Sequence, residues 1–141
     1  MLPGFGNMLM ARELIHLSGS WETGLEGWTF NGFVRNFSTD ARTGDYRVRA
    51  TAGESAEYTI ADPAGRNLDF SVWGKNISVT NVDVWYRIGA GAWISLGTVA
   101  LPPGEVYARV LKSFPTAAGQ TASVKIEVDG DADFDDWSIA E

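Results

Sequence analysis

Two tryptophans stand where strand alternation predicts polar side chains. Successive side chains of a β-strand point to opposite faces, so residues two apart share a face. Residues 68–72 place an apolar row on one face, which leaves Trp73 on the other, polar face. Residues 82–88 follow the same pattern, and Trp85 then lies beside Asp83 and Arg87. Flat rings offer contact area and charged groups offer directional hydrogen bonds, so such a surface suits sugar rings or a protein partner.

The same alternation continues in two later segments. Residues 106–112 place Tyr107 and Arg109 on the polar face, and residues 122–128 place Lys125 there. If all these strands share a sheet, its outer face is a single platform of rings and charges. We predict that this platform binds a glycan or a protein; ordinary packing beneath the N-terminal arm or a loop is the alternative. The predicted ligand-binding residues are Trp73, Trp85, Arg87, Tyr107 and Arg109, with Lys125 and Glu127 beside them and Trp93 as a further candidate.

Five aspartates crowd residues 129–136. The run is not an EF-hand calcium loop, because such a loop ends in a glutamate at about its twelfth position, and Ala140 stands there when the count begins at the first aspartate. Asp135 follows the alternation of Trp137 and Ile139, which predicts an inward carboxylate. A buried carboxylate needs a cation or hydrogen-bond donors, so Asp135 either binds a cation or accepts backbone hydrogen bonds while the remaining aspartates are solvated in a turn.

The composition excludes several kinds of site. The chain has 141 residues, no cysteine and one histidine, His16. Disulfides, thiolate zinc sites, cysteine nucleophiles and multi-histidine metal centres are therefore excluded, and a Ser-His-Asp triad nearly so. A formal net charge of −7 and a pI near 4.6 argue against nucleic acid, whose phosphates bind a surplus of lysine and arginine. No apolar stretch reaches the roughly 18–20 residues of a membrane span. We expect no catalytic residue and no cofactor.

Short apolar alternations separated by glycine, asparagine and aspartate clusters indicate an all-β domain. Gly89–Ala92 supplies a hairpin turn, and Pro102–Pro103 ends a strand. The one predicted helix covers Met8–Leu17. The predicted fold is a two-sheet antiparallel jelly-roll sandwich over residues 18–141, with an extended or short helical arm over residues 1–17. The predicted strands cover residues 19–22, 28–33, 46–50, 55–60, 68–75, 81–88, 93–99, 106–113, 122–128 and 133–140.

Four short motifs frame the domain. Trp21–Trp28 contains an aromatic-Glu pair, a glycine turn and Gly-Trp, and residues 44–48 read Gly-Asp-Tyr-Arg-Val. Residues 68–75 form a long strand with a tryptophan, and residues 134–139 contain an Asp-Asp pair. Together these motifs resemble the carbohydrate-binding modules of the galactose-binding-like type. The resemblance covers roughly residues 20–141 and implies a jelly roll more strongly than it implies any ligand.

The resemblance also implies a structural calcium ion where the first and last strands meet. Carried over by position, its ligands are Glu22, the carbonyl oxygens near Gly44 and Asp45, and Asp135. Calcium suits such a set because it takes about six to eight oxygen ligands in flexible geometry. The alternative, in which Asp135 only accepts backbone hydrogen bonds, stays open. A glycosidase-like pair of Glu22 and Asp135 is less well supported than a pair of ion ligands.

The arm over residues 1–17 is apolar and lacks the basic leader and small-residue cleavage site of a signal peptide. We expect synthesis in the host cytoplasm without export. Modules of the resembled family are usually attached to exported glycosidases, whereas we expect neither export nor a catalytic residue here. We therefore predict a structural protein of a viral particle, such as a capsid decoration or tail protein of a tailed phage. This protein would be a homo-oligomer located in the virion, with other capsid or tail subunits as partners. A carbohydrate-binding module that uses the exposed tryptophans is the alternative. The predicted partner-binding residues of the arm are Leu2, Phe5, Met8, Leu9, Met10, Leu14 and Ile15.

Overall fold

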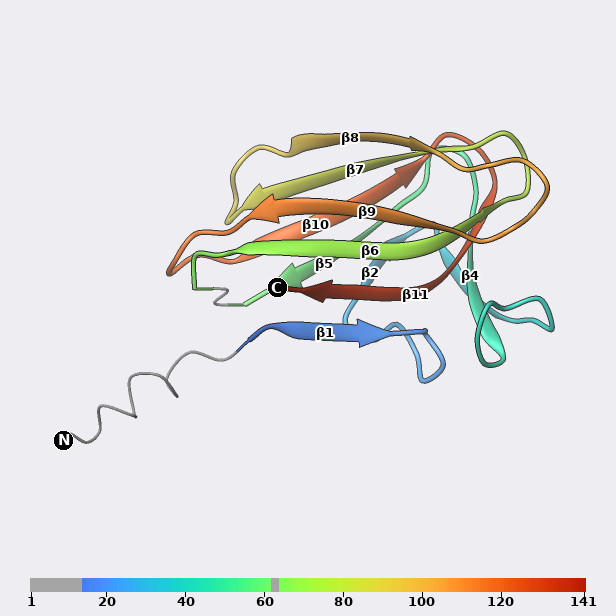
Figure 1. The fold of residues 1–141 in the computed structure, drawn as a ribbon, viewed down its shortest axis with the longest axis horizontal. Coiled ribbons are helices and arrows are strands. Elements are labelled where there is room, and N and C mark those ends of the chain that lie inside the picture. The colour runs from blue at the N-terminus through green and yellow to red at the C-terminus, as the bar shows by residue number, and fades with distance from the viewer. Residues whose placement is uncertain (1–13, 62–63) are drawn as a thin grey trace.

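The computed structural model describes residues 14–61 and 64–141 of the chain. Its strands form two antiparallel sheets that pack face to face (Figure 1). In Figure 1, β1 lies at one edge of the sandwich and β8 at the other, and β9, β6 and β11 cross in front of β10 and β5. This arrangement confirms the predicted all-β, two-sheet jelly roll.

The six-stranded sheet has the order β3-β4-β11-β6-β9, and β1 pairs with β11 beyond the part of β11 that pairs with β4. The five-stranded sheet has the order β2-β5-β10-β7-β8. The strand bounds are β1 His16–Gly19, β2 Thr29–Asn31, β3 Val34–Phe37, β4 Tyr46–Ala50, β5 Ser55–Ile60, β6 Asn67–Asn76, β7 Asn81–Ile88, β8 Ile94–Ala100, β9 Ala108–Pro115, β10 Ala122–Val128 and β11 Ala132–Ala140.

The predicted strands from Tyr46 onward agree with the structure to within two residues at either end. The first part of the domain differs more. The first strand lies at residues 16–19 instead of 19–22, and Trp21, with a φ of 57°, has left the extended conformation. β3 was not predicted, because Val34 and Phe37 are exposed at a sheet edge and do not alternate with buried residues. Val106, predicted to point inward, is 54% exposed and precedes β9.

Three of the six tryptophans meet in the core between the sheets. The ring centre of Trp28 lies 5.8 Å from that of Trp21 and 5.6 Å from that of Trp137. Tyr58 lies 5.1 Å from Trp137, and the Trp137 indole Nε1 donates a hydrogen bond of 3.1 Å to the Glu26 carboxylate. Each such ring buries about 150–250 Å² of surface. The opening and closing motifs of the sequence are therefore joined through the core.

The predicted helix over Met8–Leu17 is wrong in its described part. His16 and Leu17 belong to β1 and pair with Ala140 and Ile139 of β11. Side chains along β1 alternate between exposed and partly buried, which is the period of a strand, and Leu17 packs against the core. No helix of the described residues is long and apolar enough to span a membrane. The remainder of that helix, and the predicted partner residues Leu2, Phe5, Met8, Leu9 and Met10, lie outside the described residues.

Candidate functional site

The residues predicted to form one platform lie on two opposite outer faces of the sandwich. Trp73 of β6 and Arg109 of β9 are direct partners on the outer face of the six-stranded sheet. Trp85 of β7 and Lys125 of β10 are direct partners on the outer face of the five-stranded sheet. The condition that these strands share a sheet therefore fails. Alternation gives the face of each residue but not its sheet, and the chain crosses from one sheet to the other between β6 and β7. Tyr107 belongs with Trp73, whereas Arg87 and Glu127 belong with Trp85.

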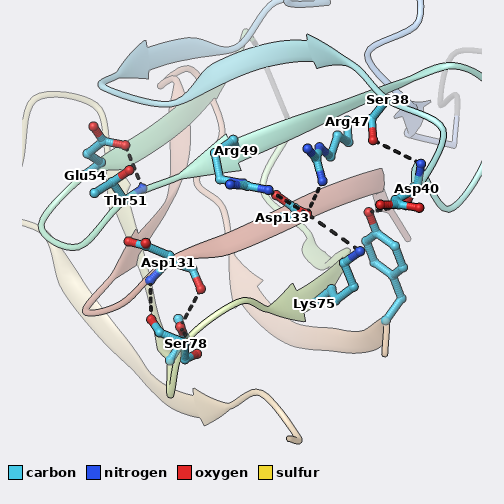
Figure 2. A network of polar contacts seen from close by, with 12 residues as sticks. Ser38, Asp40, Arg47, Arg49, Thr51, Glu54, Lys75, Ser78, Asp131 and Asp133 are labelled. Carbon is cyan, nitrogen blue, oxygen red and sulfur yellow. Dashed lines mark hydrogen bonds and ion pairs between the residues drawn. The ribbon is translucent and has the colours of Figure 1, made fainter. Parts of the chain in front are cut away.

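The outer face of the six-stranded sheet carries a closed ionic network around Asp133 (Figure 2). The fully buried Asp133 carboxylate accepts hydrogen bonds from the guanidinium groups of Arg47 and Arg49. The Lys75 ammonium lies 3.7 Å from the same carboxylate and 5.1 Å from the ring centre of Tyr107. The hydrogen bond to Asp133 raises the pKa of Arg49. Burial first, and then the charge of Asp133, raises the pKa of Tyr107. This network joins β4, β6 and β11 and places three cations around one carboxylate.

Asp135 also lies on this outer face, contrary to the prediction from alternation. A β-bulge shifts the register of β11 between Asp135 and Trp137, and Asp136 in the bulge has a φ of 50°. Asp135 therefore pairs with Trp73, whereas Trp137 returns to the core side opposite Val72. The Asp135 carboxylate is nevertheless shielded from solvent and accepts hydrogen bonds of 2.9 Å from the backbone N–H groups of Thr43 and Asp136. Burial raises the pKa of Asp135 to about 6.

The predicted calcium ligands converge on the turn between β3 and β4. The Glu22 carboxylate accepts backbone N–H hydrogen bonds of 2.7 Å from Asp45 and 3.0 Å from Tyr46. Gly44 in this turn has a φ of 64°, a conformation that favours glycine, and its Cα faces the Glu22 carboxylate. The structure thus brings Glu22, Gly44, Asp45 and Asp135 to one region, as the resemblance implies.

The arrangement of these groups does not match a formed calcium site. Both oxygens of Glu22 and both oxygens of Asp135 face backbone N–H donors, whereas calcium requires oxygens that face the ion. Among the described residues, no group of three or more histidine, aspartate and glutamate side chains is placed to hold a metal ion. The open alternative is right that Asp135 accepts backbone hydrogen bonds, but wrong for Asp133, which is fully buried in β11 and not solvated in a turn. Calcium binding stays a prediction.

Trp73 is covered by another side chain. The Arg42 guanidinium lies 3.7 Å from the Trp73 ring centre and forms a 2.7 Å ion pair with Asp136. Beside the ring, between β1 and β9, is a groove of about 430 Å³. A second hollow, of about 660 Å³, lies between β1 and β5 and is lined in part by Leu14 and Ile15. Stacking of a ligand on Trp73 requires the removal of Arg42 from its ring.

The outer face of the five-stranded sheet places two partly exposed tryptophans around one lysine. The Lys125 ammonium lies 5.6 Å from the ring centre of Trp85 and 4.4 Å from that of Trp93. The Arg87 guanidinium lies 4.5 Å from the same Trp93 ring. Neither cation forms an ion pair with any residue in the described part of the chain. Ser95 pairs with Trp85 at the edge of this cluster. We call Trp85, Arg87, Trp93 and Lys125 the tryptophan–cation cluster.

The same face becomes acidic further along its strands. Asp83 of β7 pairs with Glu127 of β10 and with Thr98 of β8, and the Thr98 hydroxyl donates a hydrogen bond to Asp83. Glu57 of β5 lies directly across from Lys125. Arg87 and Asp83 are four positions apart on one strand, or about 13 Å at roughly 3.3 Å per residue. Carboxylates thus lie beside Lys125 as well as Asp83, whereas Arg87 at the other end of the face pairs with Ser123.

Some of these residues were not predicted from the sequence. Trp93 was named only as a further candidate, although it stands two residues before Ser95 and so shares its face. Alternation places Asp83 on the same face as Trp85, but the contribution of Glu57 was missed, because its location depends on which strands pair. Arg42, which covers Trp73, comes from a turn without any periodic signal.

Comparison with known proteins supports the fold assignment. No protein-family model and no curated protein matches this sequence. The fold is similar to the CBM22-1 xylan-binding domain of Paenibacillus barcinonensis Xyn10C, with 13% identity over 91% of this chain and 94% of that one and a TM-score of 0.72. It is similar to TmCBM61 in complex with β-1,4-galactotriose, with 16% identity over 85% and 92% and a TM-score of 0.62. It is also similar to the enzymatically active domain of bacteriophage CBA120 tailspike protein 4, with 14% identity and a TM-score of 0.62. This similarity covers 86% of this chain and 20% of the tailspike chain. The chain thus has a jelly roll of the carbohydrate-binding-module type.

Proposed function

We propose that this protein is a non-catalytic carbohydrate-binding module whose ligand lies on the outer face of the five-stranded sheet. The observation that carries the proposal is the joint presentation of Trp85 and Trp93 on a partly exposed sheet face. Aromatic rings contact the flat faces of sugar rings, while neighbouring polar groups fix their orientation. The fold supports the proposal, because a xylan-binding domain and a module in complex with a galactotriose are built on similar folds.

The energetic cost of opening this face to a sugar is small. A cation over an aromatic ring at an exposed site contributes about 0.5–1 kcal/mol. Lys125 can therefore leave the rings of Trp85 and Trp93 at a cost that a few hydrogen bonds to a ligand offset. Trp73 is less suited to the same role, because Arg42 is held over its ring by the ion pair with Asp136.

Native gel electrophoresis through gels that contain defined polysaccharides tests the proposal. We expect at least one polysaccharide of a neutral and acidic panel to retard the full chain, and Trp85→Ala and Trp93→Ala to weaken retardation by about tenfold or more. Trp73→Ala on the opposite face is the matched control and should leave retardation unchanged. Neither Trp85 nor Trp93 belongs to the buried core, so near-UV circular dichroism should show that the variants are folded.

Two results would contradict the proposal. If no polysaccharide of the panel retards the protein, it does not act as a glycan-binding module. If Trp73→Ala abolishes retardation and the two other variants do not, the ligand lies on the six-stranded sheet.

A structural role in a viral particle is the second candidate. Its support is the fold similarity to part of a phage tailspike protein and the apolar sequence of the N-terminal region. The homo-oligomer, the capsid or tail partners and the virion location are part of this candidate. A deletion of residues 1–13 is a sharper test than one that ends at residue 17, because His16 and Leu17 belong to β1. Light scattering should give an oligomer for the full chain and a folded monomer after the deletion; an unchanged mass would count against an assembly role for that segment.

A further inference from the structure

The tryptophan–cation cluster offers a ligand hydrogen-bond donors and no acceptors. The Arg87 guanidinium, the Lys125 ammonium and the indole N–H groups of Trp85 and Trp93 are all donors. Within the described chain, none of these side chains has a hydrogen bond or an ion pair. They interact through contacts between the cations and the tryptophan rings. The Nε1 of Trp85 and the Nε of Arg87 are shielded from solvent without an acceptor among the described residues. Such a surface complements a group that only accepts hydrogen bonds.

Neither cation of the cluster is paired, in a protein that is acidic as a whole. The formal net charge of the chain is −7, yet Arg87 and Lys125 have no carboxylate within ion-pair distance among the described residues. On the opposite outer face, the guanidinium groups of Arg47 and Arg49 instead donate hydrogen bonds to the Asp133 carboxylate. Carboxylates also occur on the five-stranded sheet: Glu57 lies across from Lys125, and Asp83 and Glu127 lie two positions from Trp85 and Lys125 along their strands. Arg87 pairs instead with Ser123, so an anionic group meets the fewest carboxylates on the Arg87 side of the cluster.

We infer that the ligand of this face is an acidic polysaccharide whose anionic group binds between Arg87 and Lys125. The inference rests on the proposed function and narrows its ligand class. The anionic group, a uronate carboxylate or a sulfate ester, accepts charge-assisted hydrogen bonds from the guanidinium and the ammonium while the adjacent sugar ring contacts Trp93. Asp83 and Glu127 then repel a second anionic group at the far end, which fixes the direction of the chain on the sheet.

Paired polymers that differ only in charge test the inference. Polygalacturonate is compared with its carboxyl-reduced, neutral form, and dextran sulfate with dextran, in the native-gel assay on the full chain. We expect the anionic member of at least one pair to bind about tenfold or more tightly than its neutral partner, in line with the strength of hydrogen bonds to charged groups. The pair that responds identifies the anionic group as carboxylate or sulfate. Higher ionic strength should weaken this binding, because exposed charges are screened.

Variants separate this inference from the proposed function. Arg87→Met and Lys125→Met remove the charge and keep an apolar stem over the rings, so they should weaken binding of the anionic polymer about tenfold more than binding of its neutral partner. Arg109→Met removes a charge from the opposite face and should have no effect. Equal binding of both members of every pair, together with indifference to Lys125→Met, would overturn the inference and leave the proposed function intact. Failure of every polymer, neutral or acidic, would overturn both.

Discussion

The ionic network around Asp133 allows a quantitative prediction for the substitution Asp133→Asn. The change keeps the shape of the side chain but places a neutral amide against three cations, Arg47, Arg49 and Lys75. Removal of one partner from a buried ion pair costs about 3–5 kcal/mol. We expect the lower end, because the Arg49 side chain is 35% exposed and can turn to water, although the Lys75 side chain is only 9% exposed and cannot do so easily. The expected loss is about 3 kcal/mol of unfolding free energy, or roughly 10 °C in Tm for a domain of this size.

Urea unfolding followed by tryptophan fluorescence measures this loss, because Trp21, Trp28 and Trp137 are buried in the core and report on its opening. The control is Asp136→Asn three positions along the same strand. The Asp136 side chain is 21% exposed, against 0% for Asp133, and asparagine tolerates its φ of 50°, so about 1 kcal/mol or less should be lost. A loss below about 1 kcal/mol for Asp133→Asn would refute the reasoning, since that is the value of an exposed pair. In the Asp133→Asn background, Lys75→Met should recover part of the stability by removal of the unpaired cation.

Three further predictions concern the turn between β3 and β4. Burial raises the pKa of Asp135 from 3.8 to about 6, so the folded state holds this proton more tightly than the unfolded state does. In the presence of a chelator, the free energy of unfolding should therefore fall by up to about 3 kcal/mol as the pH rises from about 4 to 7. Urea titrations measure this fall, and Asp135→Asn should abolish it. If calcium binds between Glu22 and Asp135, millimolar calcium at pH 7 should raise the Tm of the wild type but not of Asp135→Asn, and calorimetry without such a shift would exclude this ion. Gly44→Ala should cost about 1–3 kcal/mol in urea unfolding, because the residue has a φ of 64° and an added Cβ would meet the Glu22 carboxylate; an unchanged midpoint would show that the turn is adaptable.

The strands were largely predictable from the sequence because their alternation is local and strong. Residues 81–88 and 122–128 alternate without a fault, and both strands have the predicted bounds. β3 was missed because an edge strand with exposed Val34 and Phe37 carries no inward row. The predicted helix failed over residues 14–17 because strand pairing with β11, far away in the chain, decides the conformation of this segment.

The site was predictable in its residue types but not in its assembly. The alternation correctly placed Trp73 and Trp85 away from the core, yet the sheet to which each strand belongs depends on pairing between distant segments. The location of Asp135 depended on a bulge, and a bulge inserts one residue and so reverses the alternation beyond it. The Asp-Asp pair is compatible with such a bulge, because aspartate tolerates a positive φ, but many Asp-Asp pairs occur without one.

The two outer faces use their cations in opposite ways, and this contrast separates structure from function. On the six-stranded sheet, Arg47, Arg49 and Lys75 surround one buried carboxylate and stabilise the sheet through it. On the five-stranded sheet, Arg87 and Lys125 rest on tryptophan rings, a contact that contributes about 0.5–1 kcal/mol each and is easily exchanged. A substitution on the first face should therefore change stability with little effect on ligand binding, and one on the second face should do the reverse. Comparison of Asp133→Asn with Lys125→Met in both assays would contradict this division if either variant changed stability and binding together.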